Sequence, residues 1–301
     1  MAEQLSGLAT EAARAGREDL DTRGTLELVT LMNDEDAAVS GCVRAASAAI
    51  AEAVDAVAAR LAGGGRLIYL GAGTAGRIAA LDAVECGPTF GIEPGTVIAV
   101  VAGGDAALKD AREGDEDDSA AAVASLQSLD LSAKDALVAV SASGRTPYAL
   151  EAARYARTVG ALAVGLSCNA GSALSAEVDI AIETPVGPEF IAGSTRLKSG
   201  TAQKLVCNTL STLVMVRLGR TYGAWMVGVQ ANNEKLRVRG RRILVEAAGI
   251  PETEAEVLLD LAGGDTRVAL VMSLGGVSTE VALRRLNAAR GRVRDAINAV
   301  D

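Results

Sequence analysis

Hydrophobic residues follow two patterns that alternate along the middle of the chain. Short runs of consecutive apolar residues, typical of buried strands, are separated by stretches in which apolar residues recur every three or four positions, as in helices. The runs predict strands over residues 66–70, 96–101, 136–140, 161–166 and 178–182. Because helical patterns separate these runs, we expect an α/β fold with a parallel sheet sandwiched by helices.

Helical patterns without strands flank this region. One covers residues 34–61, with Asn33 and Asp34 as candidate N-caps. Another, over residues 195–218, is apolar enough to cover the sheet or to meet another subunit. Further helices are predicted over residues 233–248, 252–261, 266–272 and 279–289. The expected division is an N-terminal helical segment, residues 1–56, a doubly wound domain, residues 57–220, and a small C-terminal helical subdomain, residues 221–301.

Composition and charge exclude several kinds of protein. The chain has 301 residues, of which 50% are hydrophobic, so it can form a core and is not a disordered protein. Its formal net charge of −9 disfavours binding to nucleic acid. No apolar run approaches the ~20 residues that a membrane-spanning helix requires. We expect a small-molecule ligand, with no nucleic-acid and no membrane partner.

The N-terminus and the cysteines indicate the compartment. Residues 1–20 lack the apolar segment of a secretory signal. Cys42, Cys86, Cys168 and Cys207 are widely spaced, which argues against a disulfide scaffold and a thiolate zinc site. We predict reduced core thiols and a cytoplasmic location.

Histidine is absent from the sequence. This excludes a Ser-His-Asp or Cys-His nucleophile and an imidazole metal ligand. Acid–base chemistry must therefore use Asp, Glu, Lys, Tyr or water, and carboxyl groups are the leading candidates.

The loop after the first predicted strand is rich in glycine. Gly71, Gly73 and Gly76 have the spacing G-x-G-x-x-G, which occurs in dinucleotide-binding folds. Such folds place an acidic residue at the tip of the next strand, ~20 residues further on, and here none follows the strand 96–101 until Asp105, beyond Gly103 and Gly104. We favour the alternative that the glycines form a tight turn where strand and helix backbones approach closely.

The loop after the third predicted strand suits a phosphate group. Residues 141–146 read Ser-Ala-Ser-Gly-Arg-Thr between a buried strand and a helix. Ser141, Ser143 and Thr146 would there join free backbone amides at the positive end of the helix. The alternative is that Ser143 or Thr146 simply caps the helix.

Six strings that include both loops occur in a fixed order along the chain. They are Gly71-Ala-Gly-Thr-Ala-Gly-Arg77, Leu81-Asp-Ala-Val-Glu-Cys-Gly-Pro-Thr-Phe-Gly91, Ser141-Ala-Ser-Gly-Arg-Thr-Pro-Tyr148, Leu166-Ser-Cys-Asn169, Val186-Gly-Pro-Glu189 and Gly193-Ser-Thr-Arg-Leu-Lys-Ser-Gly-Thr-Ala-Gln-Lys204. Together they resemble the sugar isomerase (SIS) family of phosphosugar-binding domains and, more narrowly, the N-acetylmuramic acid 6-phosphate etherase family. The resemblance extends from about residue 22 to the C-terminus, and it is far more specific than any single loop.

The resemblance implies cleavage of the D-lactyl ether of N-acetylmuramic acid 6-phosphate, which yields N-acetylglucosamine 6-phosphate and D-lactate. It implies Glu85 and Glu116 as catalytic groups, which we assign as acid and base. Glu113 is the fallback for Glu116, because the residues around both form an acidic run that otherwise indicates a solvated face. Contacts to the phosphosugar are expected from Gly73, Thr74, Ser141, Ser143 and Thr146. Two carboxyl groups suffice for the elimination, so no metal or other cofactor is expected.

The expected surroundings of Glu85 suit an acid. The predicted helix ends at Cys86-Gly87-Pro88, so Glu85 would lie at its negative end beside Leu81 and Val84, and both effects favour a protonated carboxyl group. The alternative is an exposed glutamate at the end of a surface helix.

The same helix would carry Glu85 some ~15 Å from the first loop, at about 1.5 Å per residue, farther than a hexose reaches from its own phosphate. The phosphate therefore rests on the second loop, with Gly73 and Thr74 nearer the sugar, or Glu85 serves a neighbouring subunit. We expect a homodimer.

Two positions depart from the family pattern. Members usually have an Arg-Asn pair shortly after an N-terminal Thr-Glu, whereas here Thr10-Glu11 is followed by Ala12-Ala13-Arg14. This leaves the N-terminal contribution to the site open. Asp105 stands where members often have histidine.

Two other functions are compatible with the fold. A non-catalytic phosphosugar sensor like the glucokinase regulatory protein would carry two such domains, and this chain has room for one. An aldose–ketose isomerase would lack the Asp-Ala-Val-Glu-Cys string at residues 82–86.

Overall fold

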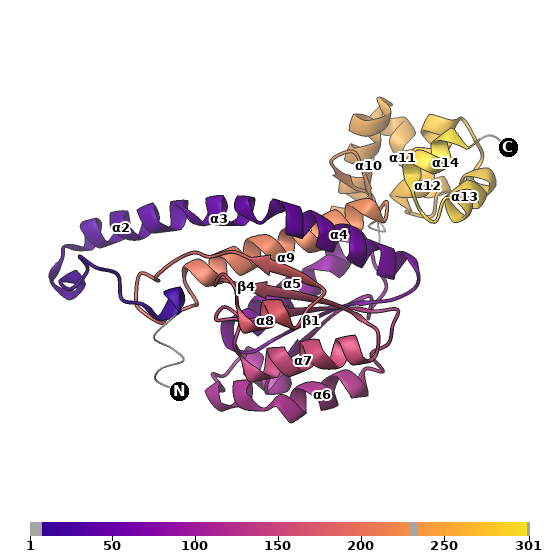
Figure 1. The fold of residues 1–301 in the computed structure, drawn as a ribbon. Coiled ribbons are helices and arrows are strands. Elements are labelled where there is room, and N and C mark those ends of the chain that lie inside the picture. The colour runs from indigo at the N-terminus through magenta and orange to yellow at the C-terminus, as the bar shows by residue number, and fades with distance from the viewer. Residues whose placement is uncertain (1–7, 229–233, 300–301) are drawn as a thin grey trace. The chain divides into compact units, whose positions relative to one another are not determined.

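The computed structural model describes residues 8–228 and 234–299 (Figure 1). The chain forms two compact units. The first comprises Met1–Val84 and Gly95–Ser211, and the second comprises Glu85–Pro94 and Thr212–Asp301. Two long helices, α5 (Gly73–Phe90) and α9 (Lys198–Arg217), each cross a boundary between the units.

A parallel sheet forms the centre of the first unit. Its strands are β1 (Leu67–Gly71), β2 (Val97–Val101), β3 (Ala136–Val140), β4 (Leu162–Ser167) and β5 (Ile180–Glu183), and their order is β2-β1-β3-β4-β5. All four neighbouring pairs are parallel. The predicted sheet is confirmed, with each strand within two residues of its expected start.

Helices cover both faces of this sheet (Figure 1). Because side chains alternate along a strand, Ile68 and Leu70 pack with α6 (Ser119–Ser128) and α7 (Pro147–Thr158). On the opposite face, the Tyr69 hydroxyl donates to the Cys207 carbonyl of α9 at 3.3 Å. Helix α4 (Ser47–Ala62) contacts β3, β4 and β5, and the short helix α8 (Ala173–Ala176) precedes β5.

The N-terminal helices differ from the prediction. Two 3₁₀ turns, η1 (Ala9–Glu11) and η2 (Leu20–Thr22), precede α2 (Thr25–Ala37), α3 (Val39–Ala45) and α4. A single helix from residue 34 is therefore wrong, and Asn33 and Asp34 lie inside α2 rather than at a cap. The earlier start escaped the pattern because the apolar residues of its first turns, Leu26 and Val29, are exposed and mark no buried face.

Helix α5 also extends beyond its predicted end, to Phe90, with Pro88 inside it. Proline removes one backbone donor, but it lies in the last turn, where Gly91 N still donates to the Gly87 carbonyl at 2.9 Å. The expected end at Cys86-Gly87-Pro88 is therefore wrong, and Glu85 does not lie at the C-terminus of the helix.

The second unit is helical. It contains α10 (Glu234–Ala248), α11 (Glu252–Leu261), α12 (Thr266–Gly275), α13 (Thr279–Ala288) and α14 (Val293–Asn298), with a small hairpin of β6 (Thr221–Tyr222) and β7 (Trp225–Met226). Their core includes Leu244, Leu259, Leu270 and Val271. The predicted helices are confirmed, although position 233 lies outside the described residues; α14 and the hairpin were not predicted.

Among the described helices, none is by itself both long and apolar enough to cross a membrane. Two bent pairs, α2–α3 with α4 and α12 with α13, reach that length and composition only when each pair is taken together.

Candidate active site

The two glycine- and serine-rich loops begin side by side. Gly71 at the end of β1 pairs with Val140 at the end of β3. The chain passes from β1 to β2 on one side and from β3 to β4 on the other, so the sheet order reverses here. Open α/β sheets bind ligands beyond the carboxyl ends of their strands at such a point.

The three hydroxyl groups of the second loop lie in one turn. Ser141 Oγ is 2.8 Å from Thr146 Oγ1 and 3.4 Å from Ser143 Oγ. Backbone amides join the turn, since Gly144 N donates to Ser141 Oγ at 3.0 Å and Arg145 N donates to Ser143 Oγ at 3.1 Å. The predicted hydroxyl cluster is therefore present around the end of β3, but the Gly144 and Arg145 amides are not free as expected, because they already donate to these serines.

Simple capping does not account for these hydroxyls. Thr146 is the N-cap residue of α7, but its side chain makes no capping hydrogen bond, and Pro147 follows it. The turn depends on Gly144, whose φ is +66° and whose Cβ, if present, would lie 2.4 Å from that of Ser172. A hydroxyl cluster at the positive end of a 12-residue helix is suited to bind a phosphate group.

The first loop begins α5. Gly73 is its first residue, is exposed and has a φ of +53°, and Thr74 is half-buried. A Cβ on Gly76 would lie 2.5 Å from the Gly71 carbonyl oxygen, so the glycines permit close packing of strand and helix, as the turn interpretation expected. Contact of Gly73 and Thr74 with a sugar stays a prediction.

A buried carboxylate occupies the N-terminus of α9. Glu189 is fully buried, and it accepts hydrogen bonds from Lys198 N and Ser199 N, both at 2.9 Å. These amides are where an anion would otherwise bind. A substrate phosphate therefore has the starts of α5 and α7 available, but not that of α9.

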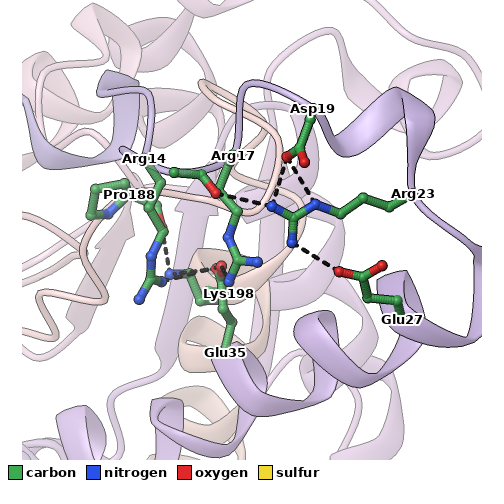
Figure 2. A network of polar contacts seen from close by, with 9 residues as sticks. Arg14, Arg17, Asp19, Arg23, Glu27, Glu35, Pro188 and Lys198 are labelled. Atoms are coloured by element: carbon green, nitrogen blue, oxygen red, sulfur yellow. Dashed lines mark hydrogen bonds and ion pairs between the residues drawn. The ribbon is translucent and has the colours of Figure 1, made fainter.

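A second buried carboxylate ties the N-terminal segment to the sheet helices. Figure 2 shows Arg14, Arg17 and Lys198 converging on Glu35, at 3.2, 3.4 and 3.2 Å. Lys198 Nζ also donates to the Pro188 carbonyl. Sequence analysis assigned no role to Glu35, Glu189 or Lys198, although Glu189 and Lys198 lie in two of the strings that carry the family resemblance. Local sequence does not show which charged groups meet in the fold.

The segment that follows β2, residues 102–118, contains the acidic run around Glu116. It forms the 3₁₀ helices η3 (Gly104–Leu108) and η4 (Glu113–Asp117), and η4 contacts α7. Arg77 in the second turn of α5 holds this segment, since its Nε donates to the Ala107 carbonyl at 2.8 Å and its Nη2 to the Asp110 carbonyl at 2.9 Å. Glu116 is exposed in η4, so it is accessible to a ligand at this edge of the sheet.

Glu85 has different surroundings from those expected. It is exposed on α5, as are Leu81 (59%) and Val84 (70%). The apolar, helix-terminal environment expected for this carboxyl group is therefore wrong for a single chain, because the apolar side chains beside it face solvent. Glu85 belongs to the second unit and Glu116 to the first, and their pairing stays a prediction.

The Cys168 thiol and the Tyr148 hydroxyl, both close to the second loop, keep their protons near neutral pH. Burial raises the pKa of the Cys168 thiol to about 11 and also raises the pKa of the Tyr148 hydroxyl. Across residues 8–228 and 234–299, no three histidine, cysteine or carboxylate side chains gather as metal ligands. Carboxyl groups thus remain the candidates for acid–base work near neutral pH.

Comparisons with known proteins agree on the fold. Residues 118–213 match the SIS domain, and residues 49–157 match the glucokinase regulatory protein N-terminal SIS domain. A phosphoheptose isomerase from Francisella tularensis is similar over 64% of this chain and 100% of its own, with a TM-score of 0.53 and 22% identity. One from Neisseria gonorrhoeae is similar over 64% and 98%, with a TM-score of 0.51 and 17% identity.

Curated relatives match almost the whole chain. The N-acetylmuramic acid 6-phosphate etherase of Rubrobacter xylanophilus is 55% identical over 99% of this chain and 98% of its own. Those of Streptomyces avermitilis and Geobacillus thermodenitrificans are 52% and 48% identical, over 98% and 97% of this chain and 95% and 99% of their own. On this similarity, the chain belongs to the N-acetylmuramic acid 6-phosphate etherase family.

Proposed function

We propose that this protein is a carbon–oxygen lyase that cleaves the D-lactyl ether of N-acetylmuramic acid 6-phosphate, giving N-acetylglucosamine 6-phosphate and D-lactate. This reaction serves the recycling of cell-wall amino sugars. The full-length match to etherases at about half identity carries the proposal, and the hydroxyl cluster at the start of α7 supports a phosphorylated substrate.

The chemistry follows from the open-chain sugar. Its C2 proton is α to the aldehyde, and the lactyl ether at C3 is β to it. A base removes the C2 proton while an acid protonates the departing ether oxygen, which releases D-lactate and leaves an unsaturated aldehyde. Water then adds at C3. We assign Glu85 as the acid and Glu116 as the base, and neither step requires a metal or another cofactor.

The phosphate would bind Ser141, Ser143 and Thr146, with Gly73 and Thr74 nearer the sugar. Two observations support a phosphate at the start of α7 rather than at the start of α9. The three hydroxyls gather at the start of α7, and Glu189 already occupies the corresponding position on α9.

We propose that the protein acts as a homodimer in which Glu85 serves the partner's site. Glu85 is 12 residues along α5 from Gly73 of the first loop, a distance of about 18 Å at ~1.5 Å per residue. Leu81 and Val84 beside it are exposed apolar side chains, and a second copy would bury them. Desolvation by that copy would give Glu85 the apolar surroundings that suit an acid.

We also propose a cytoplasmic location. All four cysteines are free thiols, and three of them, Cys86, Cys168 and Cys207, are buried, as expected for a protein that folds in a reducing compartment.

The alternative of a non-catalytic phosphosugar sensor has one observation in its favour, the match of residues 49–157 to the glucokinase regulatory protein domain. Incubating the purified chain with N-acetylmuramic acid 6-phosphate and assaying D-lactate separates the two. We expect release from the phosphorylated sugar and little from N-acetylmuramic acid itself. Tight binding of the phosphosugar without lactate release would favour the sensor.

A further inference from the structure

Thr10 is fully buried although it lies in η1, a 3₁₀ turn close to the N-terminus. Its hydroxyl oxygen accepts a hydrogen bond from Asn169 Nδ2 at 3.1 Å. Its carbonyl oxygen accepts one from Gly193 N at 3.2 Å. Asn169 follows β4, and Gly193 lies in the segment between β5 and α9, so Thr10 joins two loops at the carboxyl edge of the sheet.

Asn169 carries this connection into the proposed phosphate loop. It is almost fully buried, and its Nδ2 also donates to the Ala142 carbonyl at 3.1 Å. The same carbonyl oxygen accepts a second hydrogen bond, from Cys168 N, at 2.9 Å. A carbonyl oxygen has two lone pairs, so both acceptor positions of Ala142 are filled from the β4 side.

Fixing the Ala142 carbonyl also fixes the next amide. The described residues contain no cis peptide bond, and in a planar trans peptide the N–H points opposite to the preceding C=O. With the Ala142 carbonyl held towards the β4 loop, the Ser143 N–H points away from that loop. Ser143 is one of the hydroxyl residues proposed to bind the phosphate, and backbone amides of such loops bind phosphate as well.

The chain beyond Thr10 is anchored independently. Arg14 and Arg17 pair with the buried Glu35 of α2, which also pairs with Lys198 at the start of α9 (Figure 2). Although Ala12-Ala13-Arg14 departs from the family's usual Arg-Asn pattern, Arg14 thus helps to hold the N-terminal segment against α2.

We propose that Thr10 is a positioning residue for the phosphosugar: through Asn169 it holds the Ala142–Ser143 peptide in the orientation that binds phosphate. The inference rests on the proposed function of the second loop, and it assigns to the N-terminal segment a part in substrate affinity without contact to the reacting atoms.

The first test compares Thr10→Val with Thr10→Ser. Valine has nearly the shape of threonine but no hydroxyl, so Asn169 loses an acceptor, whereas serine keeps it. We expect Thr10→Val to raise KM for the phosphosugar about tenfold with kcat within about twofold of wild type, and Thr10→Ser to restore KM. Thr30→Val, which removes an exposed hydroxyl that donates to the Leu26 carbonyl on α2, is the matched control and should leave KM unchanged.

The second test asks whether Thr10 acts through Asn169. Asn169→Asp keeps the shape but replaces the donor with an oxygen that repels the Ala142 carbonyl. We expect KM to rise at least as much as in Thr10→Val, and the double variant to have the KM of Asn169→Asp alone, because the connection is already broken. Additive effects would overturn the proposal.

Two further outcomes would also overturn it. One is an unchanged KM in Thr10→Val or in Asn169→Asp. The other is a lower melting temperature and lower kcat at unchanged KM, which is the behaviour of a merely structural contact. Should Thr10→Val fail to fold, the KM of Asn169→Asp decides alone. Wild-type protein that neither binds the phosphosugar nor releases lactate would instead contradict the proposed function.

Discussion

Ser143 shows what a single residue contributes to the proposed phosphate site. Its hydroxyl lies 3.4 Å from that of Ser141 and accepts the Arg145 amide, so it is held in place before any ligand arrives. We expect Ser143→Ala to weaken phosphosugar binding by about 1 to 3 kcal/mol, the range for a lost hydrogen bond to a charged group. Titration calorimetry measures this, with the exposed Ser47→Ala of α4 as control. Unchanged affinity would remove Ser143 from the site.

The acid assignment is tested at Glu85. Glutamine preserves its size but cannot donate a carboxylic proton, so we expect Glu85→Gln to lower D-lactate release by about 100-fold or more. Binding of the phosphosugar should persist, because the phosphate loop is untouched. Glu52→Gln, an exposed glutamate of α4, should be fully active. Retained turnover in Glu85→Gln would refute the assignment.

The residues of the candidate site differ in how well the sequence predicts that they meet in the fold. Ser141, Ser143 and Thr146 belong to one turn, so local sequence sufficed to bring them together. Glu116 was chosen among neighbouring acids only by resemblance. Thr10 meets Asn169 across 159 positions of sequence, and no local pattern reports such a contact.

At the scale of elements, the buried cap of α9 is a stability determinant. Glu189 accepts two backbone amides at the start of this helix. We expect Glu189→Ala to lower the free energy of unfolding by about 2 kcal/mol, since two buried donors lose their acceptor. Urea unfolding followed by circular dichroism measures this. A change below a few tenths of a kcal/mol would show that water replaces the carboxylate without loss.

Asp135, which directly precedes β3, should make the free energy of unfolding fall at low pH. Burial alone would raise the pKa of Asp135, but hydrogen bonds from the Arg66 side chain and from the Ser132 and Arg66 amides outweigh it and hold the pKa below its ordinary value of 3.8. Such a group stabilises the fold above its unfolded pKa, and this contribution is lost as the pH falls through its folded pKa.

Asp135→Asn should therefore destabilise the protein by about 2 kcal/mol at neutral pH. The difference from wild type should shrink as the pH falls below 3.8. Urea unfolding of both proteins between pH 7 and about pH 3 tests the Arg66–Asp135 ion pair. A difference in unfolding free energy that does not vary with pH would contradict a charged interaction.

Elements differed in predictability for physical reasons. The central strands β1, β3 and β4 are buried on both faces, so continuous apolar runs in the sequence predicted their bounds to within one residue. Helix α2 begins earlier than expected because its first turns are exposed. Helix α5 passes Pro88 although proline lacks a backbone donor, since Gly91 N still donates to the Gly87 carbonyl.

At the scale of the whole molecule, the proposed dimer makes a measurable claim. Light scattering at working concentration should give twice the 30.5 kDa mass of one chain. Val84→Asp places a charge between the exposed Leu81 and Glu85, on the surface proposed to meet the second copy. We therefore expect this variant to be monomeric and also to release no lactate. A wild-type mass of one chain, or active monomers, would contradict a shared site.

The most direct test of the central claim follows the atoms of the reaction itself. Turnover of N-acetylmuramic acid 6-phosphate in D₂O that contains H₂¹⁸O should place deuterium at C2 and ¹⁸O at C3 of the N-acetylglucosamine 6-phosphate formed, with the ether oxygen retained in D-lactate. Mass spectrometry and NMR locate the labels. Lactate released without deuterium at C2, or with ¹⁸O in its own hydroxyl group, would contradict elimination followed by addition of water.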